Sequence, residues 1–153
     1  MTGRKSRILI FTGDGKGKTT AALGMVLRAS GHGMRTLILQ FVKADESVGE
    51  LTGLKYLPEV ETILTGRGFV PPPTSPFFAE HRQAACHGLE KAAEALRSKK
   101  YDLVILDEIF TALDRRLITE DQIMDLIEGS GEVSCLVLQG GEPPSASWQK
   151  RTR

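Results

Sequence analysis

A run of glycine, lysine and threonine residues near the amino terminus has the composition of a phosphate-binding loop. In order, it consists of Thr12, Gly13, Asp14, Gly15, Lys16, Gly17, Lys18, Thr19 and Thr20. Glycines let successive backbone N–H groups turn toward an anion with no Cβ in the way, and a helix that begins there adds the positive end of its dipole. In such a loop, Lys18 would reach the terminal phosphates and the Thr19 hydroxyl would ligate Mg²⁺. The run therefore predicts a site for a nucleoside triphosphate.

Two other interpretations of this run fit its residues less well. The standard phosphate-loop pattern has glycine five residues before Gly17, where this chain has Thr12, so the loop is a variant. A glycine-rich turn without a ligand is one alternative, but Gly-Lys-Thr-Thr at the start of a helix, directly after an apolar strand, is uncommon in ordinary turns. A dinucleotide-binding fingerprint is excluded, because Lys18 stands where its third glycine should be.

A second candidate element is the apolar segment Leu103–Leu106, which is followed by Asp107 and Glu108. A buried strand that ends in a carboxylate at the carboxyl edge of a sheet is the Walker B arrangement, which supports Mg²⁺ across from the phosphate-loop hydroxyl. Many strands end in an acidic residue, so this pattern gains its meaning from the phosphate loop. Which carboxylate contacts the metal stays open, since in many such proteins it is the first and the second serves as a base.

Histidine and cysteine residues predict no comparable site. The spacing of His81, Cys86 and His87 does not put three ligands on one helical face, so solvated helix residues are the better interpretation. Cys86 and Cys135 lie far apart without the spacing of a metal site, which indicates a reduced, cytoplasmic protein. No Ser–His–Asp or Cys–His arrangement can be argued from spacing.

Elements that would position these residues follow from the apolar pattern. Short, continuous apolar runs predict strands buried on both faces, as in a parallel sheet. The expected strands are residues 8–11, 36–42, 60–64, 101–106 and 133–138. The alternation of these strands with helices predicts an α/β fold, with a mostly parallel sheet flanked by helices and right-handed crossovers.

Helices are predicted from composition and from their end signals. Residues 18–30 are apolar nearly all round except for a strip formed by Gly24 and Arg28, which predicts a buried helix. Residues 49–57 are predicted to form a short helix, and Ser75 with Pro76 is a plausible N-cap and first-turn pair for a helix that runs to about residue 99. A further helix begins with a capping box at Thr119 and stops at Gly129.

Overall composition excludes several classes of protein. The chain has 153 residues and a formal net charge of +1, which suits one domain and gives no support to a nucleic-acid-coating protein. No apolar run approaches the ~20 residues of a membrane span, and no signal peptide is visible.

Four segments together resemble the corrinoid adenosyltransferases of the ATP:cob(I)alamin type. These are Phe11–Ala22, Arg28–Gly33, Gln40–Lys43 and Tyr101–Glu108. The resemblance covers most of residues 8–138 and implies a RecA-like P-loop fold that works as a homodimer. It also implies transfer of the 5′-deoxyadenosyl group of ATP to the cobalt of a reduced corrinoid, with release of triphosphate.

The resemblance further implies roles for individual residues. Gly13 to Thr20 would hold the phosphates of ATP, with Lys18 neutralising the triphosphate leaving group. Thr19 and Glu108 would ligate Mg²⁺, while Arg28 and Phe69 would lie on the corrinoid side. An electron-donating flavoprotein is an expected partner, because the corrinoid must be reduced.

Two departures from the family keep other functions open. Asp14 replaces the asparagine usual in the loop, and the segment Gly68–Pro71 keeps Phe69 but lacks the tryptophan that helps to wall off the lower face of the corrin. One alternative is a P-loop ATPase or kinase in which the Asp107–Glu108 pair activates water or an acceptor hydroxyl. Another is a nucleotide-binding protein that has lost its activity through its altered C-terminal segment.

The C-terminal segment also departs from the family. Residues 1–138 are predicted to form the P-loop domain and residues 139–153 an atypical, flexible tail. The family continues with Thr-Gly-Arg-Gly and an apolar helix, and one synonymous choice of codons for residues 139–153, preceded by one added base, encodes such a continuation. A frameshift is therefore one hypothesis and a divergent C-terminus the other. Resequencing of the gene distinguishes them.

Overall fold

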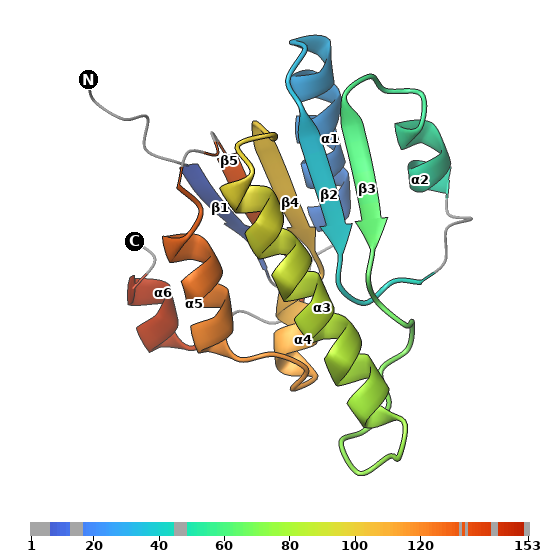
Figure 1. Ribbon diagram of the computed structural model, residues 1–153, viewed down its shortest axis with the longest axis vertical. Helices are drawn as coiled ribbons and strands as arrows, with labels where there is room; N and C mark the ends of the chain where they lie inside the picture. The colour runs from blue at the N-terminus through green and yellow to red at the C-terminus, as the bar shows by residue number, and fades with distance from the viewer. Residues whose placement is uncertain are drawn as a thin grey trace.

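The computed structural model of the chain describes residues 7–12, 17–44, 49–131, 133, 135–141 and 144–151. Its centre is a five-stranded sheet in the order β1-β5-β4-β2-β3, in which every pairing is parallel (Figure 1). The strands are β1 (Arg7–Phe11), β2 (Thr36–Gln40), β3 (Val60–Leu64), β4 (Leu103–Asp107) and β5 (Cys135–Gln139). The predicted α/β fold with a parallel sheet is confirmed, and it is consistent with a RecA-like P-loop domain.

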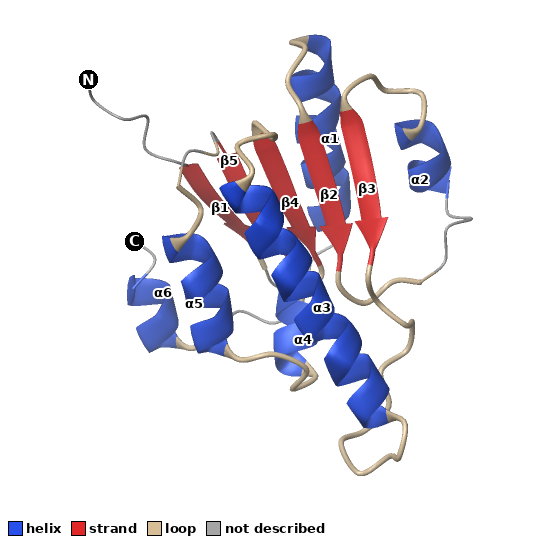
Figure 2. Cartoon of the chain, in the orientation of Figure 1, coloured by secondary structure: helices blue, strands red, loops and turns tan. Residues whose placement is uncertain are grey.

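Helices cover both faces of this sheet, as Figure 2 shows. They are α1 (Lys18–Gly31), α2 (Gly49–Leu54), α3 (Phe78–Arg97), α4 (Ile109–Asp114), α5 (Glu120–Glu128) and α6 (Ala146–Arg151). Successive strand residues point to opposite faces, so the core divides into two layers. Leu37 and Leu39 pack in the layer of α3, α4, α5 and α6, whereas Ile38 packs with α1 and α2.

Two local predictions about helices are wrong. Helix α1 is buried on one face only: Ala22, Val26 and Ala29 contact the sheet layer, while Leu27 on the outer side is 62% exposed. Helix α3 begins at Phe78, and the Ser75 hydroxyl accepts a hydrogen bond from the Phe77 backbone N–H in the turn before it. Ser75 therefore stabilises the approach to the helix and does not cap its first turn.

The capping box predicted for α5 is confirmed. The Thr119 hydroxyl accepts from the Gln122 N–H at 3.2 Å, and the Gln122 side chain accepts from the Thr119 N–H at 2.8 Å. The helix ends at Gly129, as predicted. Within the part of the chain that the structure describes, no helix is long and apolar enough to cross a membrane.

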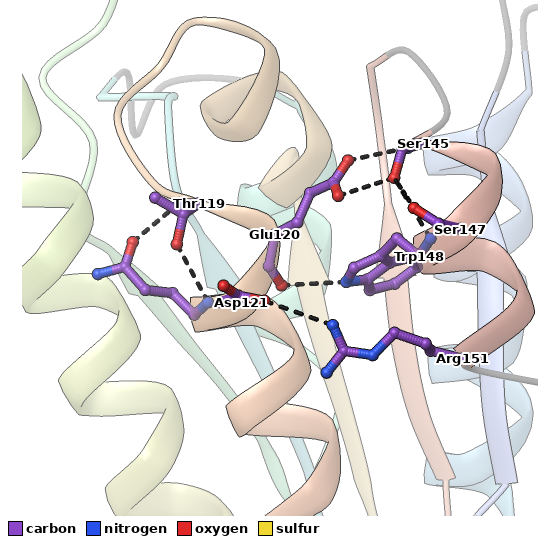
Figure 3. Close-up of polar contacts among 8 residues, drawn as sticks. Thr119, Glu120, Asp121, Ser145, Ser147, Trp148 and Arg151 are labelled. Atoms are coloured by element: carbon purple, nitrogen blue, oxygen red, sulfur yellow. Dashed lines mark hydrogen bonds and ion pairs between the residues drawn. The ribbon is translucent and has the colours of Figure 1, made fainter.

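The C-terminal segment packs on the domain through α6. Trp148 is 1% exposed, and its indole N–H donates to the Glu120 carbonyl oxygen at 3.0 Å (Figure 3). The ring meets Phe110 of α4 edge-on, with 5.9 Å between the ring centroids. The Glu120 carboxylate in turn accepts from the backbone N–H of Ser145 at 2.9 Å and from its hydroxyl at 2.8 Å. The domain boundary at residue 138 stays a prediction, and β5 continues one residue past it.

Candidate nucleotide site at the carboxyl edge of the sheet

The amino terminus of α1 lies at the carboxyl edge of the sheet. Lys18 is the first residue of α1, and Gly17 before it has φ 104°, a left-handed conformation that glycine adopts without strain. Among the residues that the structure describes, no atom lies within 4 Å of a Cβ placed on Gly17, so the preference for glycine there comes from the backbone conformation. Thr12 follows β1 directly. Gly13, Asp14, Gly15 and Lys16, which the sequence assigns to the phosphates, lie outside the described residues.

Three buried polar residues end the central strands at this edge. Gln40 of β2 pairs with Asp107 of β4, and Gln139 of β5 pairs with Phe11 of β1. Gln40, Asp107 and Gln139 are 3%, 2% and 1% exposed. The Gln40 side-chain amide donates to Asp107 Oδ2 at 2.8 Å, and the Gln139 amide donates to Thr19 Oγ1 at 3.4 Å. The structure thus brings Thr19 and Asp107, both predicted from sequence, into one polar cluster lined also by two glutamines.

Neither glutamine is among the site residues that the sequence predicts. Each ends an apolar strand with a polar residue, which is the same local signal that identified Asp107. What the local signal lacks is the strand order, which places β2 and β5 on either side of β4. Gln40 belongs to a segment that carried the resemblance to the family, although no role was assigned to it.

The Asp107 carboxylate is held in a desolvated position. Burial raises its pKa, and the hydrogen bond from Gln40 and the charge of Lys43 act in the opposite direction. Lys43 Nζ lies 3.8 Å from Asp107 Oδ2 and 4.0 Å from Glu50 Oε1. Two oxygens of this cluster, Asp107 Oδ1 and Gln40 Oε1, are buried without a hydrogen-bond partner among the described residues. Buried acceptors of this kind favour a ligand that brings a positive charge or donors.

Glu108 occupies a constrained position between β4 and α4. Its φ is 59°, a left-handed conformation that is unusual for a residue with a side chain. Burial raises the pKa of its carboxyl group, with a further contribution from the charge of Asp107. The chain after β5 passes close by, since a Cβ on Gly140 would come within 2.9 Å of Glu108 Cα. The same segment meets α4, where a Cβ on Gly141 would come within 2.5 Å of the Thr111 backbone nitrogen.

The oxygen atoms at this edge suit an Mg²⁺ ion that the protein and a bound triphosphate hold together. The Thr19 hydroxyl and the carboxylates of Asp107 and Glu108 supply hard oxygen atoms of the kind that Mg²⁺ prefers, and Asp107 Oδ1 has no hydrogen-bond partner among the described residues. Among the described residues, no group of three or more His, Cys, Asp or Glu side chains could hold a metal ion. Mg²⁺ is typically bound by one or two carboxylates together with phosphate oxygens and water, so such a group is not needed.

The two residues expected on the corrinoid side lie apart from each other. Phe69 is 87% exposed in the segment that follows β3, at the carboxyl edge of the sheet. Arg28 is exposed in the last turn of α1. At a rise of 1.5 Å per residue it stands about 15 Å along the helix from Lys18, toward the opposite edge of the sheet. Their role toward a corrinoid stays a prediction.

Comparisons with known proteins identify the family of this chain. The sequence model described as ATP:corrinoid adenosyltransferase BtuR/CobO/CobP matches residues 4–150. A corrinoid adenosyltransferase of Pseudomonas aeruginosa is 33% identical over 138 residues, covering 87% of this chain and 65% of that protein. The corrinoid adenosyltransferase of Escherichia coli K12 is 38% identical over 107 residues, covering 67% of this chain and 50% of that protein.

A third relative, corrinoid adenosyltransferase CobA of Salmonella typhimurium, is 39% identical over 111 residues, covering 67% of this chain and 50% of that protein. The chain therefore spans between half and two thirds of the length of these relatives. The family match extends over nearly the whole chain, including α6 up to residue 150. The chain belongs to the ATP:corrinoid adenosyltransferase family.

Proposed function

We propose that this protein transfers the 5′-deoxyadenosyl group of ATP to the cobalt of a reduced corrinoid and releases triphosphate. The observation that carries the proposal is the meeting of Thr19, at the amino terminus of α1, with the carboxyl end of β4 at Asp107. That arrangement suits a triphosphate with its metal, and membership of the family supports adenosyl transfer over other reactions of a triphosphate.

In this reaction the side chains need only to position ATP and to neutralise the charge of the leaving group. The electron pair of Co(I) forms the new Co–C5′ bond, the C5′–O5′ bond breaks, and O5′ leaves with its electron pair as part of triphosphate. Because Co(I) is itself the nucleophile, no side-chain base is required. Lys18 and the amino terminus of α1 stabilise the negative charge that develops on the leaving group.

Thr19, Asp107 and Glu108 would hold Mg²⁺ against the phosphates. Bound there, the metal supplies further neutralisation of the triphosphate. The Thr19 hydroxyl contributes from the first turn of α1, and the carboxylates contribute from the end of β4. Asp107 Oδ2 accepts a hydrogen bond from Gln40, and Asp107 Oδ1 has no partner among the described residues, so Oδ1 would be the oxygen available to the metal.

The corrinoid side and the partners of the enzyme are part of the same proposal. Exposed Phe69 and exposed Arg28 would lie on the corrinoid side, and the enzyme would work as a homodimer. An electron-donating flavoprotein would supply the reduced corrinoid. The free cysteines Cys86 and Cys135 support a cytoplasmic location. Light scattering of the purified chain tests the dimer.

Product analysis tests the reaction. The full chain is incubated with ATP, Mg²⁺ and chemically reduced cobalamin, and the visible spectrum and the phosphate products are followed. Adenosylcobalamin together with triphosphate is the expected result. ADP and inorganic phosphate would instead indicate an ATPase or kinase, and tight ATP binding without any product would indicate a binding protein.

A further inference from the structure

Gln40 is placed to control the Asp107 carboxylate. It is the last residue of β2, directly opposite Asp107 in the register of β2 and β4. Its backbone carbonyl accepts from the Thr65 N–H at 3.0 Å and from the Thr65 hydroxyl at 3.2 Å. The backbone of Gln40 is therefore anchored to the segment after β3, and its side chain is left for the contact with Asp107.

The hydrogen bond between Gln40 and Asp107 is short and buried from solvent. The amide nitrogen lies 2.8 Å from Asp107 Oδ2, and both side chains are almost fully buried. Among the described residues, Lys43 is the positively charged side chain paired with this oxygen, but at 3.8 Å it lies beyond hydrogen-bond distance and is partly exposed. Gln40 is thus the side chain whose donor fixes the orientation of the carboxylate.

That orientation has a consequence for the other oxygen. With Oδ2 engaged by Gln40, Asp107 Oδ1 has no partner among the described residues. Asp107 lines a small pocket together with Gln40, Thr19, Gln139 and Glu50. A carboxylate that could rotate freely would present either oxygen there, whereas this one is fixed with one defined oxygen uncommitted.

We propose that Gln40 is a positioning residue of the metal-nucleotide site, which holds the Asp107 carboxylate so that one oxygen stays available to the nucleotide-bound Mg²⁺. The inference rests on the proposed function, since it assumes a metal-bound triphosphate at this edge. It assigns to a neutral side chain on β2 a role that acts through Asp107. Gln40 would therefore affect ATP binding only where Mg²⁺ takes part.

Calorimetry with the full chain tests this role. ATP is titrated in the presence of Mg²⁺ and again in EDTA, and the ratio of the two affinities gives the gain due to the metal. Gln40→Met keeps the length of the side chain but removes the donor, and it should lower this gain by about tenfold. In EDTA, the affinity of the variant for ATP should stay within about twofold of that of the unmodified protein. The reason is that a neutral amide that acts only through Asp107 does not contribute to ATP binding without the metal.

Two further variants guard against a purely structural effect. Thr36→Val changes a fully buried hydroxyl at the other end of β2, far from Asp107, and should leave the metal-dependent gain unchanged. Gln40→Asn keeps the amide but is one methylene too short to reach Asp107, so it should behave like Gln40→Met. Thermal unfolding of each variant shows whether it is folded, and the shorter amide serves if Gln40→Met does not fold.

A double-mutant cycle completes the test. In an Asp107→Asn background, Gln40→Met should cause no further loss of the metal-dependent gain, because the two residues act as a unit. If Gln40→Met lowers ATP affinity equally with and without Mg²⁺, or if the losses in the cycle are additive, the positioning role of Gln40 is wrong. The proposed metal-nucleotide site would still stand in that case. If the unmodified protein shows no metal-dependent gain at all, both this inference and the proposed metal-nucleotide site fail.

Discussion

Trp148 should contribute a large share of the stability of this domain. It is the only tryptophan of the chain and lies on α6, a helix of six residues. Helices shorter than about 12 residues are marginal in water by themselves, so α6 depends on its packing. The packing consists of the burial of the indole, its edge contact with Phe110 and the hydrogen bond to the Glu120 carbonyl oxygen.

The expected loss follows from these contacts. Trp148→Ala removes a side chain that is 1% exposed and leaves a cavity, which costs about 3–5 kcal/mol in the free energy of unfolding. Trp148→Phe keeps an aromatic ring near Phe110 but loses the N–H donor and part of the volume, so it should cost about 1–2 kcal/mol. Domains are stable by about 5–15 kcal/mol, so a loss of this size is a large fraction of the stability of a domain.

Urea unfolding followed by far-ultraviolet circular dichroism measures these losses without needing a tryptophan. Lys150→Ala, an exposed change on the same helix, is the matched control and should stay within about 0.5 kcal/mol of the unmodified protein. In the unmodified protein, the emission of Trp148 should lie at the short wavelengths of a buried indole. A Trp148→Ala variant as stable as the control, with emission typical of an exposed indole in the unmodified protein, would refute the packing described for α6.

Three other changes test the site and the sheet edge. Lys18→Ala should weaken ATP binding by about tenfold to a hundredfold, because a charge-assisted contact to the phosphates is lost; unchanged affinity in calorimetry would contradict the assignment of the loop. Gly17→Ala should lower stability by about 1–2 kcal/mol in urea unfolding, because φ at this residue is 104° and alanine is strained there. Gly24→Ala, in mid-helix, should instead raise stability by about 0.5–1 kcal/mol, and an equal gain for Gly17→Ala would count against the conformation of Gly17. Glu61 accepts a hydrogen bond from the Tyr101 hydroxyl, which lowers the pKa of its carboxyl group. The stabilising contribution of this hydrogen bond, about 0.5 kcal/mol at this exposed position, should be present at pH 7 and be lost progressively as the pH falls below 4.5, the ordinary pKa of a glutamate, so that Glu61→Gln and the unmodified protein converge in acid unfolding curves.

The fold was predictable because its strands carry a strong local signal. Continuous apolar runs such as the one in β4 are typical of strands covered on both faces, and the structure buries that strand completely. The face of α1 that packs against the sheet could not be predicted in the same way. Its alanine, leucine and methionine residues are good helix formers, so the composition that favours a helix also conceals which face meets the sheet. Leu27, an apolar residue that lies exposed on the outer face, could therefore not be told from the buried residues of this helix.

The site was predictable only in part, because some of its residues come together only through the order of the strands in the sheet. Thr19 and Asp107 belong to local motifs and could be named from their neighbours in sequence. Gln40 and Gln139 acquire their place from strand order, which brings distant parts of the chain into hydrogen-bond distance. The bond between Gln40 and Asp107 links residues 67 positions apart, and the bond between Gln139 and Thr19 links residues 120 positions apart. No local pattern encodes contacts of that range.

The glycines after β5 should make the C-terminal segment as sensitive to mutation as the candidate nucleotide site beside it. Gly140 and Gly141 have φ of 93° and 86°, and neither has room for a Cβ beside Glu108 and α4. In a library that randomises both codons, glycine alone should survive selection for a folded protein, while exposed positions of α6 drift freely. A terminal segment would thus carry the mutational intolerance of an interior one.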